Sequence, residues 1–139
     1  MTSNPNNEMR TAELSIVVPV FNERGNIERL IELVAASLPE VVWEIIFVDD
    51  DSPDGTAAIV AEAAASEPRL HLLVRRGRRG LGSAILEGFD AARRHGFEIA
   101  VNMDADFSHD PADIPRLLAA LEPAGTAPAA VVVGSRRVP

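Results

Sequence analysis

Residues 14–50 read LSIVVPVFNERGNIERLIELVAASLPEVVWEIIFVDD, and this stretch decides the fold class. Apolar runs over 14–20 and 43–48 flank the segment 25–38, in which apolar residues recur at helical spacing. The pattern predicts a strand, a helix that stops at Pro39, and a second strand. Strands this apolar, joined by a helix, are typical of a parallel sheet that is covered on both faces.

The same alternation continues along the rest of the chain. Its further predicted elements are helix 56–67, strand 70–74, helix 82–96, strand 97–103, helix 111–123 and strand 129–135. We therefore expect an α/β fold of three layers, in which helices cover a mainly parallel sheet. Residues 1–13 lack the pattern and are predicted to form a disordered tail, which leaves a single domain over 14–139.

Composition favours a globular protein and excludes several functions. The chain is 47% hydrophobic and 24% charged, and it has no apolar run long enough to cross a bilayer. The net charge of −8 argues against nucleic-acid binding. Because the chain has no cysteine, it has neither disulfides nor thiolate metal sites. That absence fits a reducing compartment, so we expect a cytoplasmic protein.

Polar residues follow each predicted strand, where the carboxyl ends of parallel strands meet. Ligands of such sheets bind in the crevice beyond those ends, so we expect the functional site there. All 13 basic residues are arginine, and four of them cluster in RRGRRG at 75–80 after the third strand. The other polar residues at these ends are Asn22, Glu23, Asp49, Asp50, Asp51, Asp54, Asp104, Asp106, Arg136 and Arg137.

Asp104 and Asp106 stand one residue apart, directly after the fourth predicted strand. Alternate side chains of an extended chain point the same way, so the two carboxylates would share one side. Carboxylates this close repel each other and favour a cation, and hard oxygen ligands suit Mg²⁺ or Mn²⁺. Arginines at the same edge suit phosphate. The pattern therefore predicts a metal and diphosphate site, with a merely solvated loop as the alternative.

Five segments resemble, in order, the nucleotide-sugar glycosyltransferases of family 2, and within it the dolichyl- and polyprenyl-phosphate mannosyltransferases. The segments are VVPVFNERGNI (17–27), FVDDDSPDGT (47–56), GLGSAILEGF (80–89), NMDADFSHDP (102–111) and VVGSRRVP (132–139). The combination of DDDSPDGT with DADFSHDP is what makes the resemblance specific to that subgroup. Together the segments span nearly the whole chain from residue 14.

The resemblance implies a Rossmann-like GT-A fold and an inverting transfer of a hexose from a nucleotide diphosphate sugar to a lipid monophosphate. It implies mannose from GDP-mannose as the donor and a polyprenyl or dolichyl phosphate as the acceptor. A UDP-sugar with a different acceptor is the alternative that stays open. Such a lipid acceptor implies that a full-length protein contacts the cytoplasmic face of the membrane.

The resemblance also assigns roles to residues. Asp104 and Asp106 match the metal-binding pair, and we expect them to be the catalytic residues as well. Asp50 matches the residue that binds the base, and Asp51 beside it is a further candidate. The other residues predicted to bind the substrate are Pro19, Phe21, Asn22, Glu23, Arg78, Gly80, Gly82, Ser83 and Arg136. Arginine occupies the position before the glycine turn at which the family often has lysine.

Two alternative functions follow from what the chain lacks. The family pattern continues beyond residue 139, so we expect the acceptor-side portion to be absent. A nucleotide-binding module without sugar transfer is then an alternative, and an uncovered sheet edge predicts self-association. FVDDDSP also resembles the acidic pocket of a phosphoacceptor receiver domain. That class needs a lysine, which this chain lacks, and places its acidic cluster after the first strand rather than the second.

Overall fold

Four parallel strands form a sheet in the order β3-β2-β1-β4 in the computed structural model, which describes residues 13–121. The elements in chain order are β1 (Glu13–Val20), α2 (Ile27–Ser37), β2 (Val42–Asp49), α3 (Thr56–Ser66), β3 (Leu70–Val74), α4 (Leu81–Arg94), β4 (Ile99–Asn102), the 3-10 turn η1 (Pro111–Asp113) and α5 (Ile114–Leu121). The predicted alternation of strands and helices is confirmed over this range. The predicted strand 129–135 and Arg136 lie outside the described residues.

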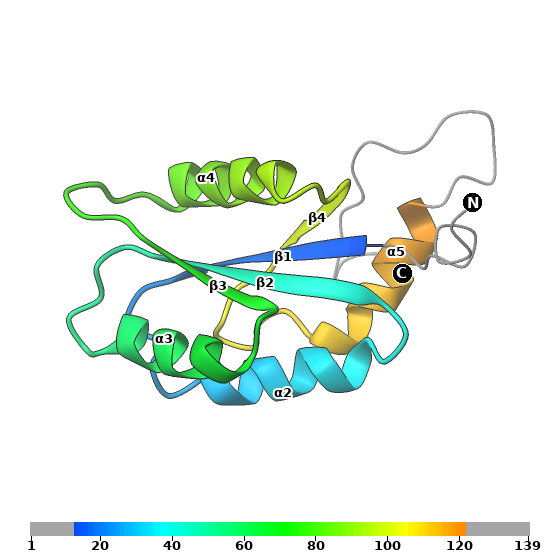
Figure 1. Ribbon diagram of the computed structural model, residues 1–139, viewed down its shortest axis with the longest axis horizontal. Helices are drawn as coiled ribbons and strands as arrows, with labels where there is room; N and C mark the ends of the chain where they lie inside the picture. Colours follow the sequence, from blue (N-terminus) through cyan, green and yellow to red (C-terminus); the bar gives the residue numbers. More distant parts are fainter. Residues whose placement is uncertain (1–12, 122–139) are drawn as a thin grey trace.

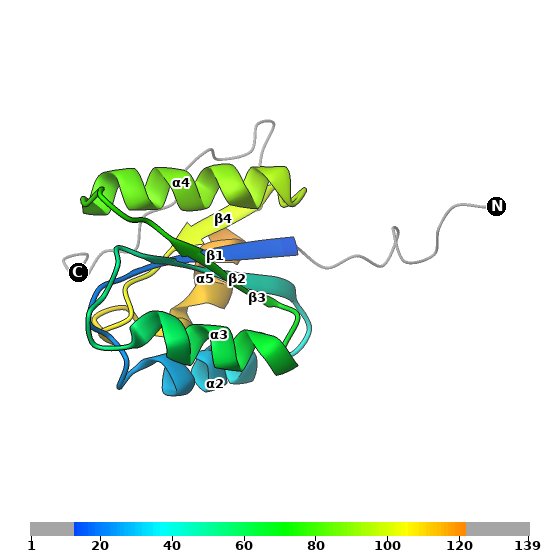
Figure 2. The same cartoon turned by 60° about the vertical axis from the view of Figure 1, so that its left-hand side comes forward.

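Helices cover both faces of the sheet, which confirms the three predicted layers (Figure 1). Among the described helices, α4 packs on one face, and α2, α3 and α5 pack on the other; the turned view in Figure 2 shows the same separation. The side chains of β1 divide between the two faces. Leu14, Ile16 and Val18 are fully buried toward α2 and α3, and Val17 is fully buried toward α4.

The strand pairing places the ends of β1 and β2 next to each other. β1 pairs with β2 along its whole length, with Val20 opposite Asp49 at the carboxyl end. At the same end Asp49 stands opposite Val74, the last residue of β3. The loops that follow these strands therefore emerge side by side, as the parallel arrangement predicted.

Helix α4 lies unusually close to β1 because Gly88 faces Val17. A methyl group on Gly88 would stand 2.2 Å from Val17 Cγ1, closer than two carbon atoms approach. Ala84, Ala91 and Ala92 are buried on the same side of the helix. These small residues let α4 approach the sheet. Its first turn lies at the carboxyl edge because α4 follows the loop that leaves the end of β3.

The largest differences from the predicted boundaries lie around β4 and α5. The strand ends at Asn102, although the backbone N–H of Met103 still donates to the Val17 carbonyl at 3.0 Å. The helix predicted from Pro111 starts as a short 3-10 turn, capped by the Asp110 side chain, and becomes α-helical at Ile114. Within residues 13–121, none of the helices has the length and hydrophobicity that crossing a membrane requires.

Candidate functional site

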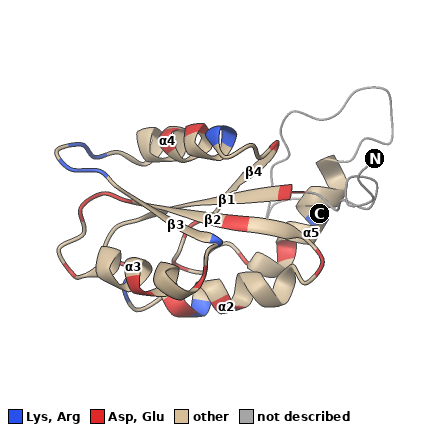
Figure 3. Cartoon of the chain, viewed as in Figure 1, with Lys and Arg blue, Asp and Glu red and all other residues tan. Residues whose placement is uncertain are grey.

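The carboxyl edge of the sheet brings opposite charges together. Figure 3 shows the arginine-rich loop between β3 and α4 at the same end of the sheet as the acidic loop between β2 and α3. The two loops are joined by contacts of Asp50. This residue directly follows β2 and stands close to the first turn of α4.

A buried ion pair connects Asp50 to Arg75, the first residue after β3. Arg75 is 3% exposed, and its Nε donates to Asp50 Oδ1 at 2.7 Å while Nη2 donates to Oδ2 at 3.2 Å. The backbone N–H of Gly80 also donates to Oδ2, at 3.2 Å. The hydrogen bonds that Arg75 donates to Asp50 are the main cause of the raised pKa of Arg75. The protein thus already supplies a donor to each oxygen of the residue predicted to bind the base.

Arg75 also holds the glycine turn whose residues were predicted to bind the substrate. Its Nη1 donates to Ser83 Oγ at 2.9 Å, and its Nη2 donates to the Gly80 carbonyl at 3.1 Å. Gly80 has a φ of 138°, a backbone conformation that favours glycine. Gly82 lies exposed in the first turn of α4. Arg75 is therefore the residue that fixes the shape of this turn.

Sequence reasoning placed Arg75 only within the arginine cluster and missed this role. The sequence did carry a signal for this role. Arg75 is the first residue after a predicted strand, and a side chain at that position lies at the end of the buried core. The later arginines of the cluster are exposed: Arg78 pairs with Glu87, and Arg79 lies over the Phe21 ring with its guanidinium carbon 4.4 Å from the ring centre. These later arginines leave positive charge facing solvent at this edge.

A hollow of about 160 Å³ lies between β1, β2 and the start of α4. Its lining residues are Pro19, Val20, Phe21, Val48, Asp50, Leu81 and Ala84. Three of the predicted substrate-binding residues therefore meet in one place. Phe21 and Leu81 are 38% and 61% exposed, so the hollow has an apolar rim above a charged group.

A larger hollow, of about 420 Å³, lies between α2 and α3 and is a poor candidate for an anionic ligand. The acidic residues in its lining are Glu28, Glu32, Glu62 and Glu67. Their charge would repel a diphosphate. The smaller hollow at the carboxyl edge is therefore the better candidate for an anionic ligand.

Backbone N–H groups after β1 donate hydrogen bonds to side-chain hydroxyls after β2, and these bonds connect the two loops. The N–H of Asn22 donates to Ser52 Oγ at 2.9 Å, and the N–H of Glu23 donates to Thr56 Oγ1 at 3.0 Å. Asp54 accepts from the N–H and the hydroxyl of Thr56, and these bonds are the chief reason that the pKa of Asp54 is lowered. Much of this segment therefore serves to shape the loops.

Asp51 differs from the other aspartates of the run DDDSPD. Asp49 is buried and accepts from the N–H of Ser52 at 3.1 Å, whereas the Asp51 side chain is 59% exposed. Asp51 lies 3.9 Å from the exposed Arg76, and its φ of 61° is left-handed. Its carboxylate is therefore accessible to a ligand, unlike that of Asp49.

Asp104 and Asp106 follow the end of β4, and Asp106 lies in a turn. The N–H of Asp104 donates to His109 Nδ1 at 3.1 Å, and buried Ala105 separates the two aspartates. Asp106 Oδ1 accepts from the N–H of Ser108 at 3.0 Å and from its hydroxyl at 2.6 Å, which lowers the pKa of Asp106. β4 ends at Asn102, two residues before Asp104, so the shared side of the two carboxylates also stays a prediction. Metal binding by the pair stays a prediction, and its two carboxylates fit Mg²⁺ or Mn²⁺ chemically.

Comparison with known proteins identifies the family. The profile of Glycosyl transferase family 2 matches residues 15–139. The chain belongs to glycosyltransferase family 2. This membership confirms the resemblance drawn from the motifs, and the parallel three-layer arrangement is that of the GT-A fold.

Relatives of this family 2 domain include enzymes named for mannose transfer. The polyprenol monophosphomannose synthase of Mycolicibacterium smegmatis is 42% identical over 130 residues, which cover 93% of this chain and 47% of that protein. The dolichol-phosphate mannosyltransferase of Pyrococcus furiosus is 35% identical over 91% of this chain and 34% of that protein. The chain thus spans about half, or less, of the length of these relatives.

A solved structure shares the fold of the family 2 domain. It is a mannosyltransferase from Pyrobaculum calidifontis in complex with GDP-Man and Mn²⁺. The superposition has a TM-score of 0.59 at 28% identity, and it covers 80% of this chain and 32% of that one. The described sheet and helices therefore correspond to about a third of that solved chain.

Proposed function

We propose that this domain binds a nucleotide diphosphate hexose for inverting transfer of the hexose to a polyprenyl phosphate. The observation that carries the proposal is the hollow at the carboxyl edge, where Pro19, Phe21 and Asp50 meet beside the arginine-rich loop. GDP-mannose is the donor we favour, because the relatives are named for mannose transfer and the solved mannosyltransferase holds GDP-Man. A UDP-hexose is the alternative donor.

The base of the nucleotide would occupy the hollow. The Phe21 ring and the Leu81 side chain offer apolar surface for a planar base to cover. Asp50 Oδ1 has one protein donor, from Arg75, and a carboxylate oxygen can accept a second hydrogen bond. An N–H group of the base would supply that bond, so Asp50 would bind the base and shape the turn at the same time.

The diphosphate would lie between the first turn of α4 and the Asp104–Asp106 turn. Arg78 and Arg79 are exposed near that turn and supply positive charge, and backbone N–H groups at the start of a helix favour anions. The solved mannosyltransferase of similar fold holds Mn²⁺. We propose that Asp104 and Asp106 hold Mg²⁺ or Mn²⁺, an ion that would stabilise the charge of the departing diphosphate.

The acceptor phosphate needs little help from a general base. Its oxygen is already an anion at neutral pH and can attack the sugar directly. Because its hydrogen bonds lower the pKa of Asp106, this carboxylate stays ionised and available to a cation at neutral pH. The lipid acceptor and contact with the cytoplasmic face of the membrane are proposals for the whole protein. Self-association and nucleotide binding without transfer are proposals for this chain.

Thermal unfolding with nucleotides tests the proposal. A ligand that binds only the folded state adds about 2.7 kcal/mol to the free energy of unfolding at a concentration a hundredfold above its Kd, and it thereby raises the melting temperature. We expect GDP or UDP with Mn²⁺ to raise the melting temperature more than either nucleotide without the metal. Phe21→Ala should reduce the shift, whereas Leu86→Ala, at an exposed residue of α4 outside the hollow, should not. No shift with either nucleotide would refute the assignment.

A further inference from the structure

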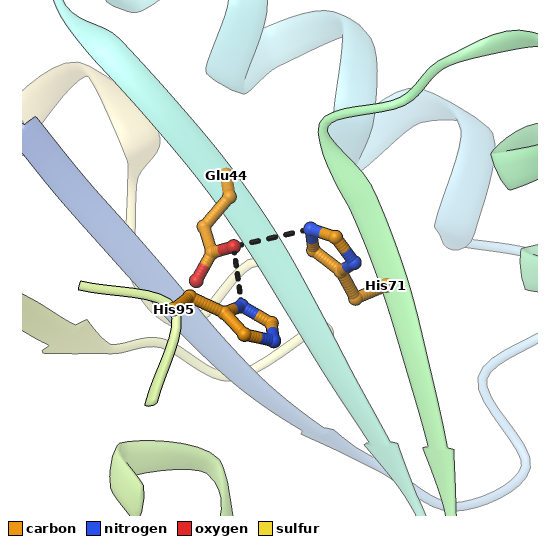
Figure 4. A group of neighbouring side chains, drawn as sticks. All are labelled: Glu44, His71 and His95. Carbon is orange, nitrogen blue, oxygen red and sulfur yellow. Dashed lines mark hydrogen bonds and ion pairs between the residues drawn. The ribbon is translucent and has the colours of Figure 1, made fainter. Parts of the chain in front are cut away.

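Glu44, His71 and His95 form a compact group at the amino edge of the sheet, opposite the candidate nucleotide site (Figure 4). Glu44 lies near the start of β2, His71 near the start of β3, and His95 directly follows α4. Three elements that are distant in sequence thus contribute one side chain each. None of the three residues takes part in the proposed function.

The spacing of their atoms is close to that of ligands around one metal ion. Glu44 Oε1 lies 3.1 Å from His71 Nε2 and 2.8 Å from His95 Nδ1, and all three atoms lie within 4.8 Å of one another. Ligands about 2.0–2.2 Å from a tetrahedral zinc ion stand about 3.3 Å apart. The two imidazole side chains are 39% and 36% exposed, so they can adjust and leave a side open to water.

The Glu44 carboxylate is buried and is aimed at the histidines. The residue is 3% exposed, and Ser15 Oγ donates to its Oε2 at 2.6 Å. That bond leaves Oε1 facing His71 and His95, in the way that outer hydrogen bonds orient metal ligands. Among the described residues, no arginine forms an ion pair with Glu44. A buried carboxylate in this position favours a positive partner.

The carboxyl end of helix α4 also favours a positive charge beside His95. His95 is the C-cap of the helix, and its N–H donates to the Ala91 carbonyl at 2.9 Å. The last carbonyls of a helix carry partial negative charge, which favours a cation nearby. The carboxylate and the helix end therefore act together at the His95 ring.

We propose that Glu44, His71 and His95 bind a zinc ion, with water as the remaining ligand. Imidazole nitrogen suits zinc, whereas Mg²⁺ and Mn²⁺ prefer oxygen ligands. The site thus differs from the Asp104–Asp106 pair in both its location and its metal. The bound ion would join the starts of β2 and β3 to the end of α4 and stabilise the fold there.

Metal titration of the protein without an affinity tag and without nucleotide tests this site directly. Zinc should raise the melting temperature of the protein. Cobalt should bind at the same site and show the visible absorption of a cobalt ion with nitrogen ligands. Loss of an outer-shell partner weakens metal binding by about 10–100-fold. Because His71 and His95 would contact the zinc directly, His71→Ala and His95→Ala should each weaken zinc binding by at least that factor. Ser15→Ala should weaken it about 10-fold. An excess of Mg²⁺ should not displace the zinc.

The third of the chain's three histidines provides the matched control. His109 is exposed and contacts Asp104 at the carboxyl edge, so His109→Ala should leave zinc binding unchanged. Circular dichroism of each variant establishes that it is folded before titration. The proposal is overturned if zinc produces no shift, or if the His71→Ala/His95→Ala double variant binds zinc as the parent does. Loss of binding in His109→Ala would likewise overturn it, because the zinc would then lie elsewhere.

Discussion

Replacing Asp50 with asparagine should destabilise the protein far more than the same change at its neighbour Asp51. The Asp50 and Arg75 side chains are 14% and 2% exposed, so Asp50→Asn leaves a buried guanidinium without its main counter-charge. Breaking one side of a buried ion pair costs about 3–5 kcal/mol. Glu87 lies 3.2 Å from Arg75 Nη1 and would still balance part of the guanidinium charge in the variant. We therefore expect the low end of the range, about 3 kcal/mol.

Urea unfolding measures this loss, and Asp51→Asn is the control. With a slope of about 2 kcal/mol per molar urea, a loss of about 3 kcal/mol lowers the midpoint by roughly 1.5 M. Asp51 is 59% exposed and lies 3.9 Å from Arg76, so its replacement should cost less than about 0.5 kcal/mol. The reasoning is refuted if Asp50→Asn costs less than about 1 kcal/mol or no more than Asp51→Asn.

Nucleotide binding by Asp50→Asn, measured at a temperature at which the variant is folded, separates its two roles. If Asp50 binds the base, GDP binding should weaken both with and without Mn²⁺. A loss seen only with Mn²⁺ would make Asp50 a metal ligand instead. Unchanged binding would leave Asp50 with the structural role alone, because its ion pair with Arg75 does not require the nucleotide.

Three further predictions address other parts of the structure. Asp104→Asn and Asp106→Asn should each abolish the Mn²⁺-dependent part of GDP binding in calorimetry and leave the melting temperature of the free protein within a few degrees. Gly88→Ala should lower the free energy of unfolding by about 1–3 kcal/mol through overpacking, whereas Gly82→Ala, where a methyl group meets nothing within 4 Å, should not. Because the folded-state pKa of Asp54 is lowered from 3.8, its stabilisation is complete above that value and is lost as the pH falls through the lowered pKa. Asp54→Asn should therefore lower the melting temperature more at pH 7 than at pH 3.

Local patterns in the sequence determined the type of each element and much of its extent. The strand predicted over 70–74 is β3 at those bounds, because an apolar run between proline and arginine leaves little freedom for its ends. The prediction was less accurate for β4, which was predicted over 97–103 and spans Ile99–Asn102. Periodicity is a property of neighbouring residues, so it can be read without knowing the fold.

Which side chains meet was decided only by the tertiary structure. Parallel strands predicted a site at the carboxyl edge, and motifs predicted that Asp50 belongs to it, but nothing local links Asp50 to Arg75, which is 25 residues away. The contact of Glu44 with His95 spans 51 residues and depends on the order β3-β2-β1-β4 and on the close approach of α4. The chemistry of a charged group depends on what stands opposite it in space. That neighbour is set by strand order and helix packing, which no single segment of the sequence encodes.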